Sequence, residues 1–205
     1  MMPGSRSWRE KFWCGFARGA VIAAALLAAA PALANRDGPP RSRAIDAIII
    51  HSLGGPDCLD GVVFHRQVDG TAAEWAAFFA KLPGVSIHYV VGRDGAIVAG
   101  LSESKIASHA IGWNTRSIGI ELVNNGDGMD PFPDAQLTAQ VRLVRDIRTR
   151  HPKVTPENIR RHSDVDRSSF PARKHGAACT KFRRKLDPGD AFPWPRFIEV
   201  IRTGR

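Results

Sequence analysis

The sequence predicts a single α/β domain in which helices flank a central mixed β-sheet. Three observations support this prediction. Residues 48–50 are three consecutive isoleucines, and such a β-branched run is typical of a strand buried on both faces. Residues 86–101 hold two strand-like segments around the turn sequence Gly-Arg-Asp-Gly. Two later segments carry apolar residues at helical spacing, so strands and helices alternate along one chain.

The first 34 residues have the features of a secretory signal peptide. A segment with four Lys or Arg side chains precedes an apolar, alanine-rich segment, residues 19–30, and the A-x-A cleavage motif Ala32-Leu33-Ala34. The apolar run is short for a membrane span, although an uncleaved N-terminal anchor is the alternative interpretation. Residues 35–43 are polar and contain Gly-Pro-Pro, as expected for a linker, and residues 44–205 form the predicted domain.

The net charge of the chain indicates which kinds of partner to expect. The chain carries a net charge of +9, and residues 1–34 hold four basic residues and one acidic residue, so cleavage leaves +6 on about 171 residues. This charge favours anionic partners, and export makes nucleic acid the least expected of them. No segment after residue 34 is long and apolar enough to cross a bilayer, and we expect a monomer.

The segment after the isoleucine strand is expected to begin irregularly. Residues 52–61 should form a loop and residues 62–68 a short edge strand. Thr71 and Glu74 match a capping box, which predicts the start of a helix. That helix should bury an apolar stripe made by Trp75, Phe78, Phe79 and Leu82.

The second half of the chain continues the alternation of strands and helices. In residues 117–123, every second side chain is apolar, which places Gly119 and Glu121 on the opposite face of the predicted strand. Asp134 is expected to cap the longest helix, which ends before Pro152.

Several polar residues could carry chemistry, and each has a plainer interpretation. His51 ends the isoleucine strand, where a rigidly held side chain can serve as a metal ligand or general base, but a lone histidine is more often a satisfied core residue. Glu121 could be a desolvated general base, although alternation alone favours an ordinary exposed strand residue. Asp187 precedes Pro-Gly and could simply form a turn. The residues alone therefore indicate an exported α/β domain, with a metal enzyme as one interpretation.

Together, the motifs resemble those of a known family. They follow one another in the family's order: Ile48–His51, Ser86–Gly95, His109-Ala110, Asn114–Val123, His162–Val165, Lys185–Gly189 and Phe192–Trp194. The chain is similar to the zinc-dependent N-acetylmuramoyl-L-alanine amidases of the phage-lysozyme and peptidoglycan-recognition-protein superfamily, from about residue 45 to about residue 194. The resemblance implies hydrolysis of the amide between the muramic acid lactyl group and L-alanine in peptidoglycan or a muropeptide.

The resemblance also implies roles for individual residues, with a zinc site at the strand ends. It implies three zinc ligands: His51, His162 and Asp187. Glu121 matches the carboxylate that activates water, and Lys185 matches the group that stabilises the oxyanion. The muropeptide contacts fall at His109 and Asn114. The alternative is a non-catalytic exported peptidoglycan-binding protein on the same fold, but such members typically lose a zinc ligand.

The chain departs from the family pattern at a few positions. Ser52 replaces a second histidine, and Ile87 stands where some members have a catalytic tyrosine, which gives more weight to Glu121. The segment from His162 to Lys185 is longer than usual, so Asp164 or His175 is an alternative third ligand.

Two cysteines remain after residue 34, Cys58 and Cys179, and either one disulfide or two unpaired thiols is compatible with an exported protein. If His51 and His162 share one metal, the loops that carry the cysteines begin at the same point, which predicts a disulfide between them.

Overall fold

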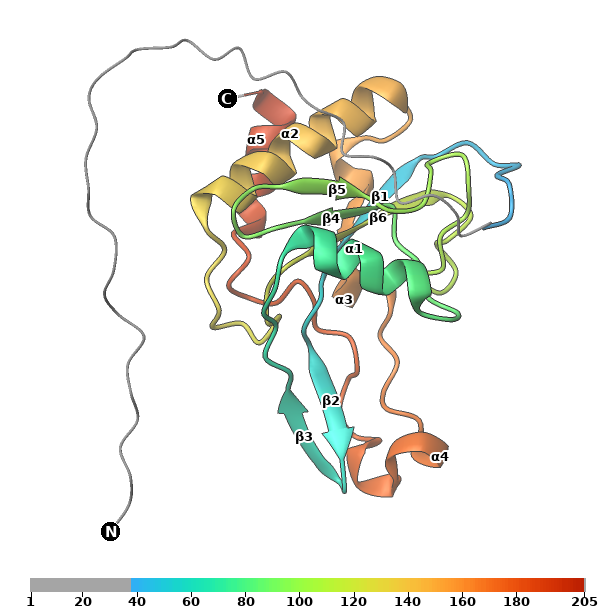
Figure 1. Cartoon of the computed structure of the whole chain (residues 1–205), viewed down its shortest axis with the longest axis vertical. Helices are drawn as coiled ribbons and strands as arrows, with labels where there is room; N and C mark the ends of the chain where they lie inside the picture. Colours follow the sequence, from blue (N-terminus) through green and yellow to red (C-terminus); the bar gives the residue numbers. More distant parts are fainter. Residues whose placement is uncertain (1–37, 205) are drawn as a thin grey trace, which may run out of the picture.

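A five-stranded sheet forms the centre of the computed structural model, which describes residues 38–204 (Figure 1). The predicted signal peptide, residues 1–34, lies outside the described residues. The strand order is β5-β4-β6-β1-β7, and only β5 runs antiparallel to its neighbour, which confirms a mixed sheet. The bounds are β1 (Ala47–Ser52), β4 (Tyr89–Val91), β5 (Ile97–Ala99), β6 (Ser117–Leu122) and β7 (Ile159–Arg161).

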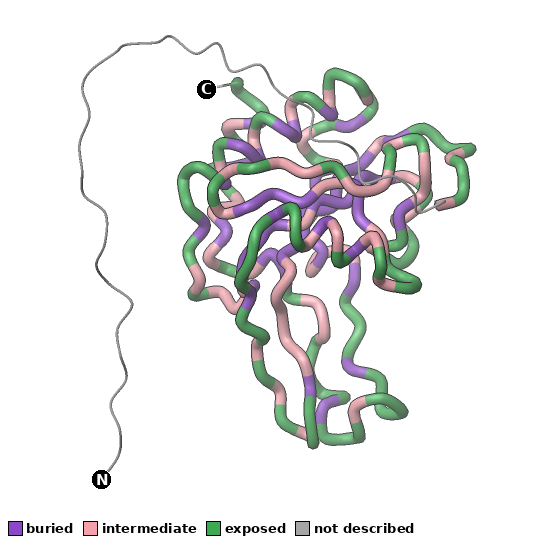
Figure 2. The backbone as a smooth tube through the Cα atoms, in the orientation of Figure 1, coloured by how far each residue is buried: buried purple, intermediate pink, exposed green. Residues whose placement is uncertain are grey.

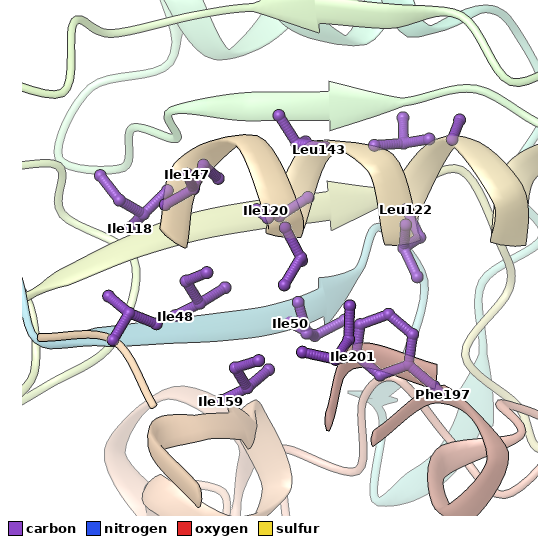
Figure 3. Close-up of a cluster of buried hydrophobic side chains, with 14 of the residues drawn as sticks. Ile48, Ile50, Ile118, Ile120, Leu122, Leu143, Ile147, Ile159, Phe197 and Ile201 are labelled. Carbon is purple, nitrogen blue, oxygen red and sulfur yellow. The ribbon is translucent and has the colours of Figure 1, made fainter. Parts of the chain in front are cut away.

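Helices cover both faces of this sheet. On one face, α2 (Asp134–Arg150) and α5 (Trp194–Thr203) pack their apolar side chains against those of β1, β6 and β7 (Figure 3). On the other face, α1 (Ala72–Lys81) packs against β4 through a smaller apolar cluster. Figure 2 shows that the buried residues concentrate in the sheet between these layers. The predicted single α/β domain is therefore confirmed.

The two central strands follow the predicted patterns. Ile48, Ile49 and Ile50 are all fully buried, as a strand covered on both faces requires. In β6, Ile118 and Ile120 belong to the cluster beneath α2 and α5, whereas Gly119 and Glu121 lie on the opposite face. Val90 pairs with Glu121 and belongs to the α1 cluster, so α1 and Glu121 share one face of the sheet.

The structure confirms the predicted N-terminal cap of α1 but not that of α2. The capping box is present, because Thr71 Oγ1 accepts from the Glu74 backbone N–H at 3.2 Å and Glu74 Oε2 accepts from the Thr71 N–H at 2.8 Å. The predicted cap of α2 is wrong: Pro133 is the N-cap residue and makes no side-chain bond, while Asp134 is the first helical residue. Its charge still suits the positive end of the helix dipole. Phe78 was expected in the core but is 48% exposed.

The expected irregular loop at residues 52–61 contains a strand. β2 (Pro56–Leu59) pairs antiparallel with β3 (Val62–His65) in a separate two-stranded sheet that projects from the domain (Figure 1). Beside it lies the long segment after α3 (His162–Val165), which forms α4 (Ala172–His175) and the short 3-10 helix η2 (Ala177–Cys179). We call residues 56–65 and 169–183 together the arm.

The predicted disulfide is present in the arm. Cys58 and Cys179 are bonded, with their Cα atoms 6.5 Å apart. Phe170 and the partly buried Val63 pack around the bond and complete a small apolar cluster. The disulfide therefore fastens the hairpin to the segment that leads from His162 towards Asp187.

Part of the expected linker, residues 35–43, contacts the domain. Pro40 forms an isolated β-bridge with Lys105. The Arg41 guanidinium donates to four backbone carbonyls, and the shortest of these bonds, both 2.7 Å, go to Glu103 and Ser117. Between residues 38 and 204, no helix has the length and apolar character needed to span a membrane.

Candidate metal centre

The three predicted ligands meet at the carboxyl ends of neighbouring parallel strands. His51 is the fifth residue of β1, and His162 begins α3 directly after β7, which pairs with β1. Asp187 lies on the loop beyond the arm, where its backbone carbonyl accepts from the Ser163 N–H at 3.0 Å. Ligands bind at this edge of open α/β sheets, because side chains from adjacent strand ends converge there.

The ligand atoms of these residues converge closely. His162 Nδ1 is 2.9 Å from both His51 Nδ1 and Asp187 Oδ2, and the latter two atoms are 3.3 Å apart. Three electronegative atoms facing one another in a buried space repel unless a proton or cation lies between them. Ligand atoms around a tetrahedral zinc ion stand roughly 3.3–3.6 Å apart, given bonds of about 2.0–2.2 Å. The donor set of two imidazoles and one carboxylate therefore fits zinc.

The surroundings of two of the ligands give them the protonation state that a metal requires. His51 is 2% exposed, and burial, followed by the charge of His162, lowers its pKa to about 4, so the ring is neutral at pH 7. Burial alone would raise the pKa of Asp187, but the charge and hydrogen bond of His162 outweigh it, and the pKa lies well below the usual range. The site thus offers a neutral imidazole and a carboxylate.

Glu121 lies directly opposite His51 in the register between β6 and β1. Its Oε2 atom is buried and has no hydrogen-bond partner among the described residues. Burial, assisted by the charge of Asp187 and opposed by Lys185, raises the pKa of Glu121 to about 8. A carboxyl group with a raised pKa beside a metal-ligand cluster has the properties of a general acid and base.

The residues around Asp187 favour it over the alternative third ligands. Ser52 Oγ donates to the Pro188 carbonyl at 3.1 Å, so the residue that replaces a second histidine holds the segment carrying Asp187. His175 lies in the arm, where its Nδ1 is 3.2 Å from the Cys58 carbonyl. Within residues 38–204, neither His175 nor Asp164 joins the ligand group. The charge of Lys185 lowers the pKa of both His51 and Glu121, which places its ammonium within electrostatic reach of the site.

The two residues expected to contact a muropeptide lie in the loop before β6. The His109 ring is 3.0 Å from His51, measured between Nδ1 and Nε2, and burial lowers its pKa well below the usual value. Asn114 Oδ1 accepts from the backbone N–H groups of His109 and Ala110 at 3.0 and 2.7 Å. Both residues therefore organise the edge of the site.

Sequence reasoning missed Ser117, whose Oγ is 3.2 Å from His109 Nε2. The alternation of β6 was the available signal, because Ser117 shares a face with Gly119 and Glu121.

The chain matches known proteins over most of this domain. The profile of the Amidase_2 family, described as N-acetylmuramoyl-L-alanine amidase, matches residues 41–190. A 1,6-anhydro-N-acetylmuramyl-L-alanine amidase, AmpD of Enterobacter cloacae, is 29% identical over 184 residues, covering 82% of this chain and 87% of that protein. The N-acetylmuramoyl-L-alanine amidase AmiD of Escherichia coli K12 is 33% identical over 160 residues, covering 67% of this chain and 51% of AmiD.

A solved structure of E. coli AmiD shares the fold. It is a complex with the substrate anhydro-N-acetylmuramic acid-L-Ala-D-gamma-Glu-L-Lys, and it matches with a TM-score of 0.54 at 26% identity. The match covers 80% of this chain and 60% of the AmiD chain.

Proposed function

We propose, on the premise that this chain belongs to the N-acetylmuramoyl-L-alanine amidase family, that it hydrolyses the amide between the lactyl group of muramic acid and L-alanine. The observation that carries the proposal is the buried convergence of His51, His162 and Asp187 with Glu121 on the adjacent strand. The relatives AmpD and AmiD support the substrate class, a peptidoglycan fragment that contains this bond.

The proposed reaction assigns a step to each polar residue of the site. A bound zinc ion would polarise the amide carbonyl and lower the pKa of a water molecule to about 7. Its positive charge would also favour the ionised form of Glu121, which is the form that accepts a proton. Glu121 accepts a proton from the attacking water as the new carbon–oxygen bond forms, and returns it to the alanine nitrogen as the carbon–nitrogen bond breaks. Lys185 places positive charge where the oxyanion develops. His51, His162 and Asp187 would hold the metal.

We propose that Asn114 contributes to muropeptide binding. Its Oδ1 is occupied by two backbone N–H groups, which fixes the side chain at the edge of the site. The Nδ2 group makes no hydrogen bond to another described residue and is therefore a donor for a peptide carbonyl or sugar oxygen.

Product analysis tests the proposed activity. The purified protein, loaded with zinc, is incubated with an anhydro-muropeptide and, separately, with insoluble peptidoglycan. Mass spectrometry should find a free stem peptide beginning with L-alanine and a sugar that retains its lactyl carboxylate. Cleavage at a peptide or glycosidic bond would overturn the assignment. The two substrates also distinguish an enzyme for soluble fragments from one for the intact polymer.

A peptidoglycan-binding protein without activity is the competing function. The complete ligand set argues against it, because a binding module has no need for a buried carboxylate oxygen that lacks a partner among residues 38–204 and lies beside three ligands. Retention on insoluble peptidoglycan without any released stem peptide would favour the binding function.

We also propose that the protein acts in an oxidising compartment outside the cytoplasm, as a monomer. The Cys58–Cys179 disulfide supports export, since such bonds persist mainly in oxidising compartments. Every residue assigned to the site comes from one chain, so the proposed reaction needs no second copy.

A further inference from the structure

We propose that His109 and Ser117 act as positioning residues that keep the imidazole proton of His51 on Nε2 and leave His51 Nδ1 as a free ligand atom. This inference rests on the metal-dependent function proposed above. It concerns the tautomer of His51 and the zinc affinity of the site, both of which can be measured without substrate.

Ser117 sets the direction of the hydrogen bonds between Ser117, His109 and His51. Its Oγ is 2.8 Å from the Trp113 backbone carbonyl, which can only accept, so the hydroxyl proton is donated there. Among the described residues, the other hydrogen-bond neighbour of Oγ is His109 Nε2, at 3.2 Å. Since the hydroxyl proton is already used, Oγ accepts from His109, and the proton of a neutral His109 ring is on Nε2.

The hydrogen bond between His109 and His51 sets the proton position in the His51 ring. A neutral imidazole has one N–H, so His109 Nδ1 is an acceptor. It lies 3.0 Å from His51 Nε2, which must therefore carry the proton of the His51 ring. The remaining nitrogen, His51 Nδ1, is the atom that faces His162 and Asp187. In metal sites, the hydrogen bond made by one ring nitrogen sets which nitrogen binds the ion.

We call the hydrogen-bonded series Ser117, His109 and His51 the relay. The backbone around it holds the His109 ring in place. Asn114 fixes the loop through two bonds to the backbone N–H groups of residues 109 and 110. A Cβ atom at Gly119 would lie 2.6 Å from His109 Cγ, so only glycine lets the ring rest against β6. One face of β6 thus presents in order an acceptor at Ser117, space at Gly119 and the carboxylate of Glu121.

This assignment changes the expected role of His109. Both of its ring nitrogens are engaged inside the protein, by Ser117 and by His51. A muropeptide would therefore meet only the carbon edge of the ring, and the main effect of His109 is on the metal centre.

The first test needs no substitution. In the purified protein stripped of metal with a chelator, nitrogen-15 NMR of the histidine rings should show His51 as the Nε2–H tautomer. A proton on His51 Nδ1 would overturn the proposal.

The second test compares zinc affinity, by competition with a chromophoric chelator, among variants. His109→Leu removes the acceptor and should weaken zinc binding by about 10- to 100-fold, the usual effect of losing such a partner. His109→Asn places an amide oxygen near the position of Nδ1 and should restore most of the affinity. Ser117→Ala should weaken zinc binding less. Without the serine hydroxyl, His109 is no longer held in one tautomer, but its Nδ1 can still accept the proton from His51 Nε2.

His65→Leu, on β3, is the matched control and should leave zinc affinity unchanged. Unchanged affinity in folded His109→Leu, or equal loss in the Leu and Asn variants, would refute the relay. If the relay holds but no stem peptide is released from any substrate, the proposed amidase function fails and the positioning role stands.

Discussion

At the scale of single residues, Glu121 is the clearest sign of function. One of its carboxylate oxygens is buried without a partner among the described residues, and burial raises its pKa to about 8. A buried, unpaired polar group costs stability, so folding alone gives no reason to keep it. A general base that must exchange protons with water and substrate explains this arrangement.

We expect Glu121→Gln to keep zinc and to lose hydrolysis by about 100-fold or more, the usual contribution of general acid–base catalysis. Glutamine has nearly the same volume as glutamate but does not accept the proton. Turnover of a muropeptide and zinc content should be measured on the same sample. Near-normal turnover in the zinc-loaded variant would assign the base role to another group.

We expect His162→Ala to lose both zinc and activity, because it removes one of three buried ligands from the cluster. His175→Ala is the matched control, since His175 lies in the arm and should not affect metal content. Elemental analysis of the two purified variants decides the matter. Stoichiometric zinc in His162→Ala would show that the ligand assignment is wrong.

At the scale of elements, the arm depends on contacts between segments far apart in the sequence. The disulfide joins residues separated by 121 positions, and the apolar cluster around it contains few side chains. The remainder of the arm is largely exposed, including Leu59 and Val62, each 65% exposed. Such a structure depends strongly on its covalent link.

We expect the double substitution Cys58→Ser with Cys179→Ser to lower the free energy of unfolding by roughly 2–4 kcal/mol, the typical effect of removing a disulfide. The arm should also open before the sheet does. Limited trypsin digestion, analysed by mass spectrometry, should then cut first at the basic residues Arg173, Lys174, Lys181 and Arg183. An unchanged order of cleavage relative to the disulfide-bonded protein would contradict this role.

Elements that are determined by patterns in neighbouring residues could be predicted from the sequence, and elements that depend on contacts between distant residues could not. The strands β1 and β6 were predictable, because burial and alternation are written in consecutive residues. β2 was missed, because four residues that include Pro56 and Asp57 form a strand only through pairing with β3 and the disulfide. Asp187 was proposed from resemblance, since no local pattern places it beside His51.

At the scale of the whole molecule, Glu103 joins the sheet to α2. Its carboxylate accepts from Tyr89 of β4 at 2.6 Å and from Arg150 at the end of α2 at 2.7 Å, and it lies 2.7 Å from His151 Nε2. Burial alone would raise the pKa of Glu103, but the bonds from Arg150, Tyr89 and His151 outweigh it and lower the pKa to about 2. The ionised form is therefore stabilised by folding.

This pKa predicts how stability responds to acid. A carboxyl group whose folded pKa is lowered stabilises the protein fully above its unfolded pKa, about 4.3, and loses that contribution as the pH falls towards 2. After allowance for solvent screening, we expect Glu103→Gln to remove about 1–2 kcal/mol at pH 7. Urea unfolding between pH 7 and pH 2.5 should show a smaller decline for the variant than for the unmodified protein. Parallel curves would rule out Glu103 as the cause.

The contacts of Arg41 bear on where this domain can be cut. Its guanidinium donates to four backbone carbonyls. Three of them belong to Asn114, Thr115 and Ser117, in the loop before β6 and at the start of that strand. A truncated protein that begins at residue 44, the predicted domain boundary, would leave those oxygens to water beside the loop that positions His109. A unit that keeps these contacts therefore begins at or before residue 41, only a few residues after the predicted cleavage point at Ala34.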